Sequence, residues 1–137
     1  TLSYDKLLVC SGASAFIPPV PGLREGNNVV GLRNLDDAVL IKEQAKKVKN
    51  VVVLGAGLVG IDAVSGLLRQ GLNISLVEMS NKILPLQLDK HASDVYEKKF
   101  TEEGVSLKLD VKAEKLLLDE NNNPKSFIIE YWRRSTM

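Results

Sequence analysis

A glycine-rich turn between two apolar runs is the feature that most constrains this chain. Residues 51–54 form an apolar run, and Gly55, Gly57 and Gly60 follow it with the spacing G-x-G-x-x-G. A helix-like segment comes next, and a second apolar run, residues 74–77, ends at an acidic residue. A strand, a glycine turn, a helix and a second strand in this order are typical of a βαβ unit that binds a dinucleotide.

Each glycine of the turn has its own physical role. Gly55 permits the tight turn out of the strand, Gly57 lets a pyrophosphate approach the backbone, and Gly60 lets the helix pack close to the sheet. The pyrophosphate would meet backbone N–H groups and the positive end of the helix dipole. Other candidate cofactor contacts in the same turn are Ala56, Leu58 and Val59. The alternative is a tight strand-to-helix turn that holds no ligand.

An acidic residue ends the second apolar run. Glu78 lies 21 residues after Gly57, at the expected tip of the strand. A carboxylate there can accept hydrogen bonds from the adenosine ribose hydroxyls, and it would repel the 2′-phosphate of NADP. The sequence therefore predicts NAD(H) as the cofactor. The alternative is a solvated acid at the end of a strand.

Three further residues have two interpretations each. Lys82 could reach the ribose or the pyrophosphate, or it could be solvated. His91 has no partner at metal-ligand spacing, which favours a surface histidine and no metal site. Cys10 is the only cysteine and follows two apolar residues in a predicted strand, which favours a small buried apolar side chain.

Length and composition exclude several classes of protein. The chain has 137 residues, which suits one domain, and it is 45% hydrophobic and 26% charged. Its net charge of +1 makes nucleic acid an unfavoured partner. The longest uncharged apolar stretch is too short to cross a bilayer, and the first residues do not resemble a signal peptide. A lone cysteine cannot form an internal disulfide, so we expect a reducing, cytoplasmic setting and no membrane partner.

The order of the predicted elements indicates an α/β fold. We expect a Rossmann-like parallel sheet with flanking helices and a small antiparallel β hairpin or meander at the end. Besides the glycine-turn helix, helices are expected from the N-cap Asn34 to about residue 48, and from the N-cap Asp89 to Gly104. The prolines of residues 18–22 predict a stiff, extended linker. The remaining expected strands are residues 4–10, 29–32, 105–109, 112–118 and 126–132.

Three stretches of the chain resemble a known family. The first joins YDK at residues 4–6 through CSGA at 10–13 to PPVPG at 18–22, the second is LRNLDDA at 32–38, and the third covers residues 51–85. Together they resemble the pyridine nucleotide-disulfide oxidoreductases, a family of FAD-dependent, NAD(P)H-using flavoenzymes. Within that family the likeness is to NADH oxidases, NADH nitrite reductases, rubredoxin reductases and coenzyme A-disulfide reductases.

The resemblance implies a reaction and a division of the chain. Residues 1–25 would be a remnant of the FAD-domain crossover and its linker, and residues 26–137 would be the NAD(H)-binding domain. NADH would lie along the glycine turn and Glu78, and hydride would pass to an FAD held by another domain. The flavin would then reduce a disulfide, oxygen or a redox protein.

The chain departs from the family pattern at several points. An FAD-binding glycine motif does not precede residue 4, and Cys10 falls where the family has an alanine-like residue. The family's return strand does not follow Trp132. The resemblance therefore implies a domain fragment that binds nucleotide but lacks the parts for turnover. Leu58 stands where some members have a tyrosine over the nicotinamide pocket, so that pocket should be more open.

Asp62 also departs from the family, which commonly has glutamate there and places it near the nicotinamide. The predicted helix puts Asp62 in its first turn, where an acid is stabilising in any case. A nicotinamide contact and a purely structural role both stay open.

Two other functions compete with an enzyme domain. The chain could be a stand-alone module that senses NAD(H) without flavin chemistry, or a structural domain whose glycine turn holds nothing. In the intact family, residues 1–22 belong to the sheet of the FAD domain of the full-length protein. In this chain they could be loose, or they could pair with a second copy of the chain as a homodimer.

Overall fold

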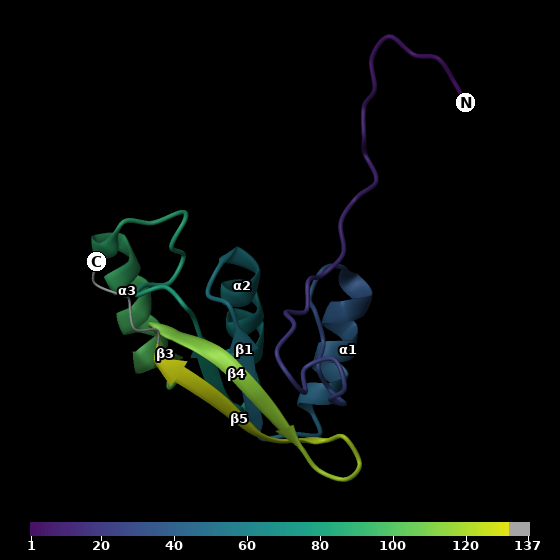
Figure 1. The fold of residues 1–137 in the computed structure, drawn as a ribbon. Helices are drawn as coiled ribbons and strands as arrows, with labels where there is room; N and C mark the ends of the chain where they lie inside the picture. The colour runs from purple at the N-terminus through teal and green to yellow at the C-terminus, as the bar shows by residue number, and fades with distance from the viewer. Residues whose placement is uncertain (132–137) are drawn as a thin grey trace.

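The fold is described from a computed structural model of the chain, for residues 1–131 (Figure 1). The α/β fold class that we expected is confirmed, with a three-stranded parallel sheet and a separate two-stranded antiparallel sheet. In chain order the elements are α1 (Leu35–Ala45), β1 (Asn50–Leu54), α2 (Leu58–Leu67), the short 3-10 helix η1 (Leu68–Gln70), β2 (Asn73–Val77), α3 (Lys90–Glu102), β3 (Ser106–Lys108), β4 (Val111–Leu118) and β5 (Pro124–Tyr131).

The parallel sheet brings the two strand ends of the glycine motif together. Its order is β1-β2-β3, and β1 pairs with β2 in a register that runs from Asn50 opposite Asn73 to Leu54 opposite Val77. Both strands therefore end at the same edge. Since Gly55 follows β1 and Glu78 follows β2, this register sets the glycine turn beside the acidic residue.

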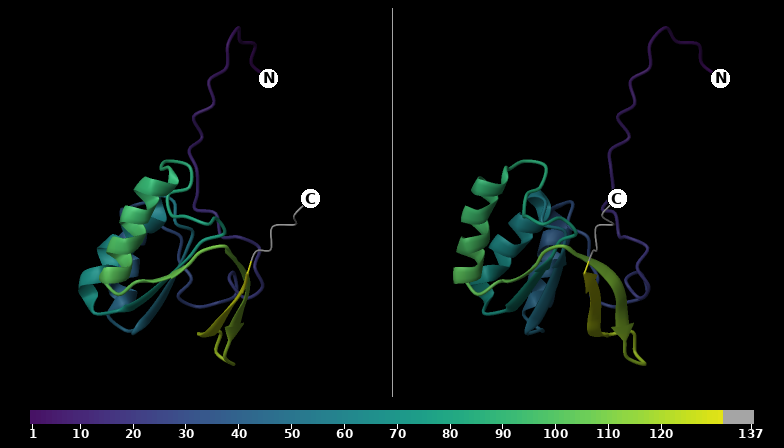
Figure 2. Two further views of the ribbon diagram at one scale, coloured as in Figure 1. Left: turned by 90° about the vertical axis from the view of Figure 1, so that its left-hand side faces the viewer. Right: turned by 60° about the vertical axis from the view of Figure 1, so that its left-hand side comes forward.

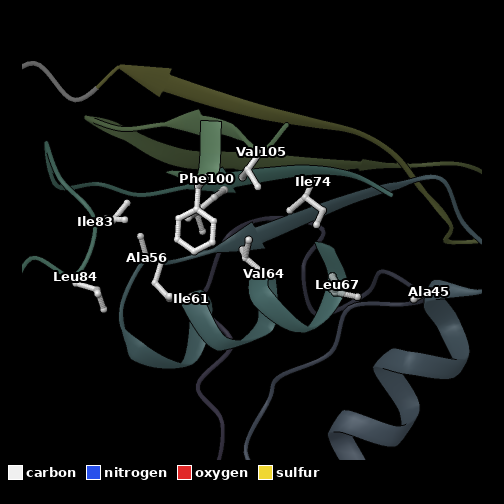
Figure 3. Packing of buried hydrophobic residues seen from close by; sticks show 11 residues of the cluster. Ala45, Ala56, Ile61, Val64, Leu67, Ile74, Ile83, Leu84, Phe100 and Val105 are labelled. Atoms are coloured by element: carbon white, nitrogen blue, oxygen red, sulfur yellow. The ribbon is translucent and has the colours of Figure 1, made fainter. Parts of the chain in front are cut away.

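One face of the parallel sheet carries the hydrophobic core. Side chains of α2, α3 and β2 form a single buried cluster, in which Phe100 of α3 lies between Val64 of α2 and the loop residue Ile83 (Figure 3). Alternate residues of β1 divide between the faces, since Val51 and Val53 pack on this cluster while Val52 stays exposed. The core thus holds α2, and with it the glycine turn, against the sheet.

Helix α2 lies so close to the preceding turn that one position has no room for a side chain. A Cβ placed on Gly60 would lie 1.9 Å from the carbonyl oxygen of Gly55. Further along the same helix, a Cβ on Gly66 would meet nothing within 4 Å. The close approach at Gly60 is therefore chiefly to the turn that follows β1, whereas the position of Gly66 is open.

Two helices begin at the side-chain caps that the sequence predicts. The Asn34 side chain accepts a hydrogen bond from the Asp37 N–H at 2.9 Å, and the Asp37 carboxylate accepts one from the Asn34 N–H at 3.1 Å. The Asp89 carboxylate accepts from the Ala92 N–H at 2.8 Å at the start of α3. Helix α1 ends at Ala45, three residues earlier than expected.

The proline-rich linker packs on the terminal hairpin, which the sequence did not indicate. The Leu116 N–H of β4 donates to the Pro21 carbonyl at 2.9 Å, and the Asn27 N–H donates to the Asn122 carbonyl at 2.7 Å. Leu23 is buried, and a Cβ on Gly22 would lie 2.1 Å from the Leu116 carbonyl oxygen. Residues 21–27 are therefore a folded turn docked on β4–β5, and the stiff extended linker that we expected ends before them.

The hairpin turn is shaped by one carboxylate. Asp119 accepts hydrogen bonds from the N–H groups of Asn123 and Asn121, each at 2.8 Å. The bond from Asn123 does most to hold the pKa of this exposed carboxyl below its usual range. The two strands that the turn joins pair antiparallel from Val111 opposite Tyr131, so the expected hairpin is confirmed.

The prediction of two strands near the N-terminus is wrong. Residues 4–10 and 29–32 adopt no strand, and the N-terminal tail extends away from the rest of the molecule in all views (Figure 2). Cys10 is exposed, not buried. Within residues 1–131 these segments have no paired strand, and a strand without a neighbour leaves its backbone groups to water. Trp132, the expected last strand residue, lies outside the described residues.

Among residues 1–131, no helix combines the length and apolar character needed to cross a bilayer.

The contrast between the two glycines of α2 predicts opposite effects on stability. Gly60→Ala should lower the free energy of unfolding by roughly 1–3 kcal/mol, because the methyl group overlaps the Gly55 carbonyl. Gly66→Ala should raise it by up to about 1 kcal/mol, because alanine favours the helix and the site is open. Urea unfolding followed by circular dichroism measures both values. Equal effects of the two substitutions would contradict the close packing at Gly60.

Candidate dinucleotide site

The glycine turn leaves β1 through a residue in the left-handed region of the backbone. Gly55 has a φ of 94°, and its N–H donates to the Val77 carbonyl at the end of β2, at 2.8 Å. A side chain at this φ would be strained, although a Cβ would meet no other atom within 4 Å. The conformation, and not the space around it, therefore calls for glycine at Gly55.

The N-terminus of α2 is open to a ligand. Gly57 is the N-cap and offers no side-chain cap, unlike Asn34 and Asp89 at the starts of α1 and α3. A Cβ on Gly57 would meet nothing within 4 Å. The first N–H groups of a helix have no partner inside the helix, and the helix dipole makes this end attract anions. The arrangement suits a phosphate group seated over Gly57.

The carboxylate of Glu78 lies against the glycine turn. One of its oxygens accepts a hydrogen bond from the Ala56 N–H at 2.8 Å, and the other accepts one from the Ser80 N–H at 2.7 Å. The Glu78 backbone is held as well, since its N–H donates to the Lys108 carbonyl at 2.9 Å. Two hydrogen bonds leave lone pairs on both oxygens, so this half-buried carboxylate can still accept from a ligand hydroxyl.

Ala56 is fully buried, and both of its backbone polar groups are engaged. Its N–H donates to Glu78, and its carbonyl accepts from the Leu84 N–H at 2.8 Å. Ala56 is therefore an internal part of the turn, whereas the neighbouring Leu58 and Val59 are 59% and 56% exposed. Direct contacts of these three residues with a cofactor stay predictions.

Asp62 lies outside the first turn of α2. The helix begins at Leu58 and has no acidic residue in its first turn, so the expected dipole interaction is wrong for this residue. Asp62 is the fifth helical residue, and its side chain is exposed. A contact with the nicotinamide stays a prediction that the fold leaves accessible.

The Lys82 ammonium group is engaged within its own loop. It donates to the Leu88 carbonyl, and the residue is half-buried. A contact with the ribose or the pyrophosphate stays a prediction, and it would require Lys82 to exchange this partner for a ligand oxygen. His91 is exposed on α3, as expected for a surface histidine.

Three residues that the sequence analysis did not single out contribute to the site. Leu84 donates to the Ala56 carbonyl, and Ser93 and Glu97 of α3 hold the residue before it. They lie 28 or more residues beyond Ala56. No motif spacing connects them to the glycine turn, because the connection is made only by the folded loop between β2 and α3.

Comparison with known proteins identifies the family. Residues 1–127 match the family described as pyridine nucleotide-disulphide oxidoreductase. The chain is 38% identical over 120 residues to the NADH oxidase of Enterococcus faecalis, an alignment that covers 88% of this chain and 27% of that protein. The chain therefore spans about a quarter of the length of this curated relative.

Two solved structures of the same kind align with most of the chain. The water-forming NADH oxidase from Lactobacillus brevis, solved with NADH bound, has a TM-score of 0.76 and 28% identity, over 94% of this chain and 28% of that one. An FAD-dependent pyridine nucleotide-disulphide oxidoreductase from Desulfovibrio vulgaris has a TM-score of 0.78 and 27% identity, over 94% of this chain and 33% of that one. The resemblance carried by the three sequence stretches is confirmed, and the chain belongs to the pyridine nucleotide-disulphide oxidoreductase family.

Proposed function

We propose that residues 26–137 form the NADH-binding domain of an FAD-dependent oxidoreductase. The observation that carries the proposal is the uncapped start of α2 at Gly57, with the Glu78 carboxylate held beside it. An anion site and a hydroxyl acceptor next to each other match the pyrophosphate and the adenosine ribose of NADH. Relatives that are NADH oxidases support the same assignment.

Each group of the site has a distinct task in this proposal. The N–H groups of Leu58 and Val59 donate to the pyrophosphate oxygens, while Glu78 accepts from the ribose hydroxyls and disfavours a 2′-phosphate. Asp62 is assigned a contact with the nicotinamide. Lys82 is assigned a contact with the ribose or the pyrophosphate. NADH supplies a hydride, and an FAD in another domain of the longer protein accepts it. The residues of this chain bind and orient.

The exposed N-terminal tail supports an additional domain. Leu8 and Phe16 are 85% and 79% exposed. Large apolar side chains in an extended segment favour burial against another folded unit, and we assign the part of residues 1–25 that precedes the docked turn at residues 21–27 to the side of the FAD domain. A free-standing NAD(H) sensor would have no need for this segment. A homodimer would also cover it, and sedimentation of the chain distinguishes a dimer from a monomer.

We also propose that the protein is located in the cytoplasm. Cys10 is an exposed free thiol, and such a thiol persists in a reducing, cytoplasmic compartment.

The first test is a calorimetric titration of the chain with NADH and with NADPH. The chain should bind NADH and should bind NADPH at least about tenfold more weakly, because Glu78 repels the 2′-phosphate. Circular dichroism on the same sample checks that the chain is folded. A folded chain that binds neither nucleotide would contradict the proposal.

Gly57→Val should remove most of the NADH affinity. A Cβ at this position meets no protein atom within 4 Å, and a valine side chain there occupies the space assigned to the pyrophosphate. The dissociation constant should rise by about tenfold or more, equivalent to roughly 1.4 kcal/mol. Gly66→Val is the matched control, since it lies in the same helix with an equally open Cβ position and should leave binding unchanged. Equal NADH affinities of the two variants would show that the nucleotide does not bind over Gly57.

Glu78→Arg should reverse the preference between the two nucleotides. Arginine attracts the 2′-phosphate, but it cannot accept the hydrogen bonds from Ala56 and Ser80, so NADH binding should weaken strongly. The ratio of the NADPH to the NADH dissociation constant should fall by about tenfold or more. Glu120→Arg makes the same charge change in the exposed hairpin turn and should leave the ratio unchanged. If Glu78→Arg leaves the ratio of the two dissociation constants unchanged, Glu78 does not contact the ribose.

A further inference from the structure

Segment 82–88, between β2 and α3, connects the glycine turn to α3. Its residue Leu84 donates its N–H to the Ala56 carbonyl at 2.8 Å. The neighbouring Ile83 belongs to the same buried cluster as Ala56 and Phe100 of α3 (Figure 3). Residues 83–84 therefore contact both the proposed nucleotide site and helix α3, which contains none of the predicted site residues.

Two side chains of α3 hold both backbone groups of Ile83. The Ser93 hydroxyl lies 2.9 Å from the Ile83 carbonyl oxygen, and the Glu97 carboxylate accepts the Ile83 N–H at 3.3 Å. The two side chains also contact each other, with 2.9 Å between the Ser93 Oγ and the Glu97 Oε1. Ser93 and Ile83 are fully buried, and the Glu97 side chain is 17% exposed. Water therefore offers little competition for these bonds.

The backbone of segment 82–88 requires such support. Leu84 has a φ of 47°, in the left-handed region that a leucine seldom adopts, and it is buried. A conformation of this kind persists only where the surrounding structure holds it. Ser93 binds the Ile83 carbonyl, which belongs to the same peptide unit as the Leu84 N–H, so this bond sets the direction of the N–H that reaches Ala56. Glu97 holds the peptide unit before it, through the Ile83 N–H.

Ala56 connects Leu84 to the proposed nucleotide site. Its carbonyl is held by Leu84 and its N–H by Glu78, so the peptide units on both of its sides have fixed orientations. The second of these units leads into Gly57, where α2 begins. The direction of the first free N–H groups of α2 therefore depends on both contacts.

From these contacts we infer that Ser93 and Glu97 are positioning residues for the NADH site, acting through Ile83 and Leu84 on the glycine turn. The inference rests on the proposed function, because it takes the glycine turn to be the place where NADH binds. Neither residue touches the nucleotide itself.

The experiment compares variants of the full chain by two measurements. Ser93→Ala and Glu97→Ala remove the contacts to Ile83, whereas Glu97→Gln keeps an oxygen that can accept the Ile83 N–H. Ser126→Ala, at an exposed position of β5, and Glu102→Gln, at an exposed position of α3, are the matched controls. The first measurement is the NADH dissociation constant. The second is amide hydrogen exchange, read at Ala56, Gly57 and Leu84 and compared with Leu76 on the central strand.

Ser93→Ala and Glu97→Ala should each weaken NADH binding by roughly fivefold, as expected for members of one hydrogen-bond network. Exchange should accelerate at Leu84 and in the glycine turn while Leu76 keeps its protection. Glu97→Gln should restore most of the affinity, and the two controls should match the wild type. A purely structural role would instead accelerate exchange at Leu76 to the same extent.

The outcomes separate this inference from the proposed function. A folded wild-type chain that does not bind NADH overturns the proposed function and, with it, the NADH role of the pair. A wild type that binds, with Ser93→Ala and Glu97→Ala at unchanged affinity, overturns only the inference. If Glu97→Ala does not fold, Ser93→Ala decides: wild-type affinity and wild-type exchange at Leu84 in this variant overturn the inference.

Discussion

The two hydrogen bonds of Ala56 are the constraint on which the proposed site depends. Its N–H is held by the Glu78 carboxylate after β2, and its carbonyl is held by the Leu84 N–H before α3. Ala56 is fully buried, so both bonds are shielded from water. They join the ends of two parallel strands and the loop that leads to α3. The start of α2 at Gly57 takes its direction from this junction.

The rest of the fold supplies rigidity to the junction. Helices α2 and α3 share one buried cluster on the face of the sheet, and at Gly60 the first turn of α2 packs directly against the Gly55 carbonyl. A site on such elements is preorganised, which reduces the entropy lost on binding. The turn at residues 21–27 lies outside this core and packs on β4 through Pro21. The remainder of the N-terminal segment is exposed, and this difference supports a second domain in the proposed enzyme.

Local chemistry explains which predictions from the sequence are confirmed. The caps Asn34 and Asp89 act within four residues of themselves, and the glycine turn depends on the left-handed backbone at Gly55 and the close approach at Gly60, so both could be predicted without the fold. The expected strand at residues 4–10 and the buried Cys10 are wrong, because a strand and its burial require neighbours elsewhere. The first-turn position of Asp62 is wrong because the helix begins at Leu58.

The sequence by itself determined the α/β class, the parallel βαβ unit, the open helix start at Gly57 and the acidic residue that follows β2. These features follow from apolar periodicity and from glycines, which lack a side chain and so adopt backbone conformations that other residues rarely adopt. Only the tertiary structure decided that Glu78 and Leu84 hold the same residue, that Ser93 and Glu97 support Leu84, and that the linker docks on the hairpin. These contacts join residues that are distant in the chain, and only the packing of the sheet and helices brings them within hydrogen-bond distance.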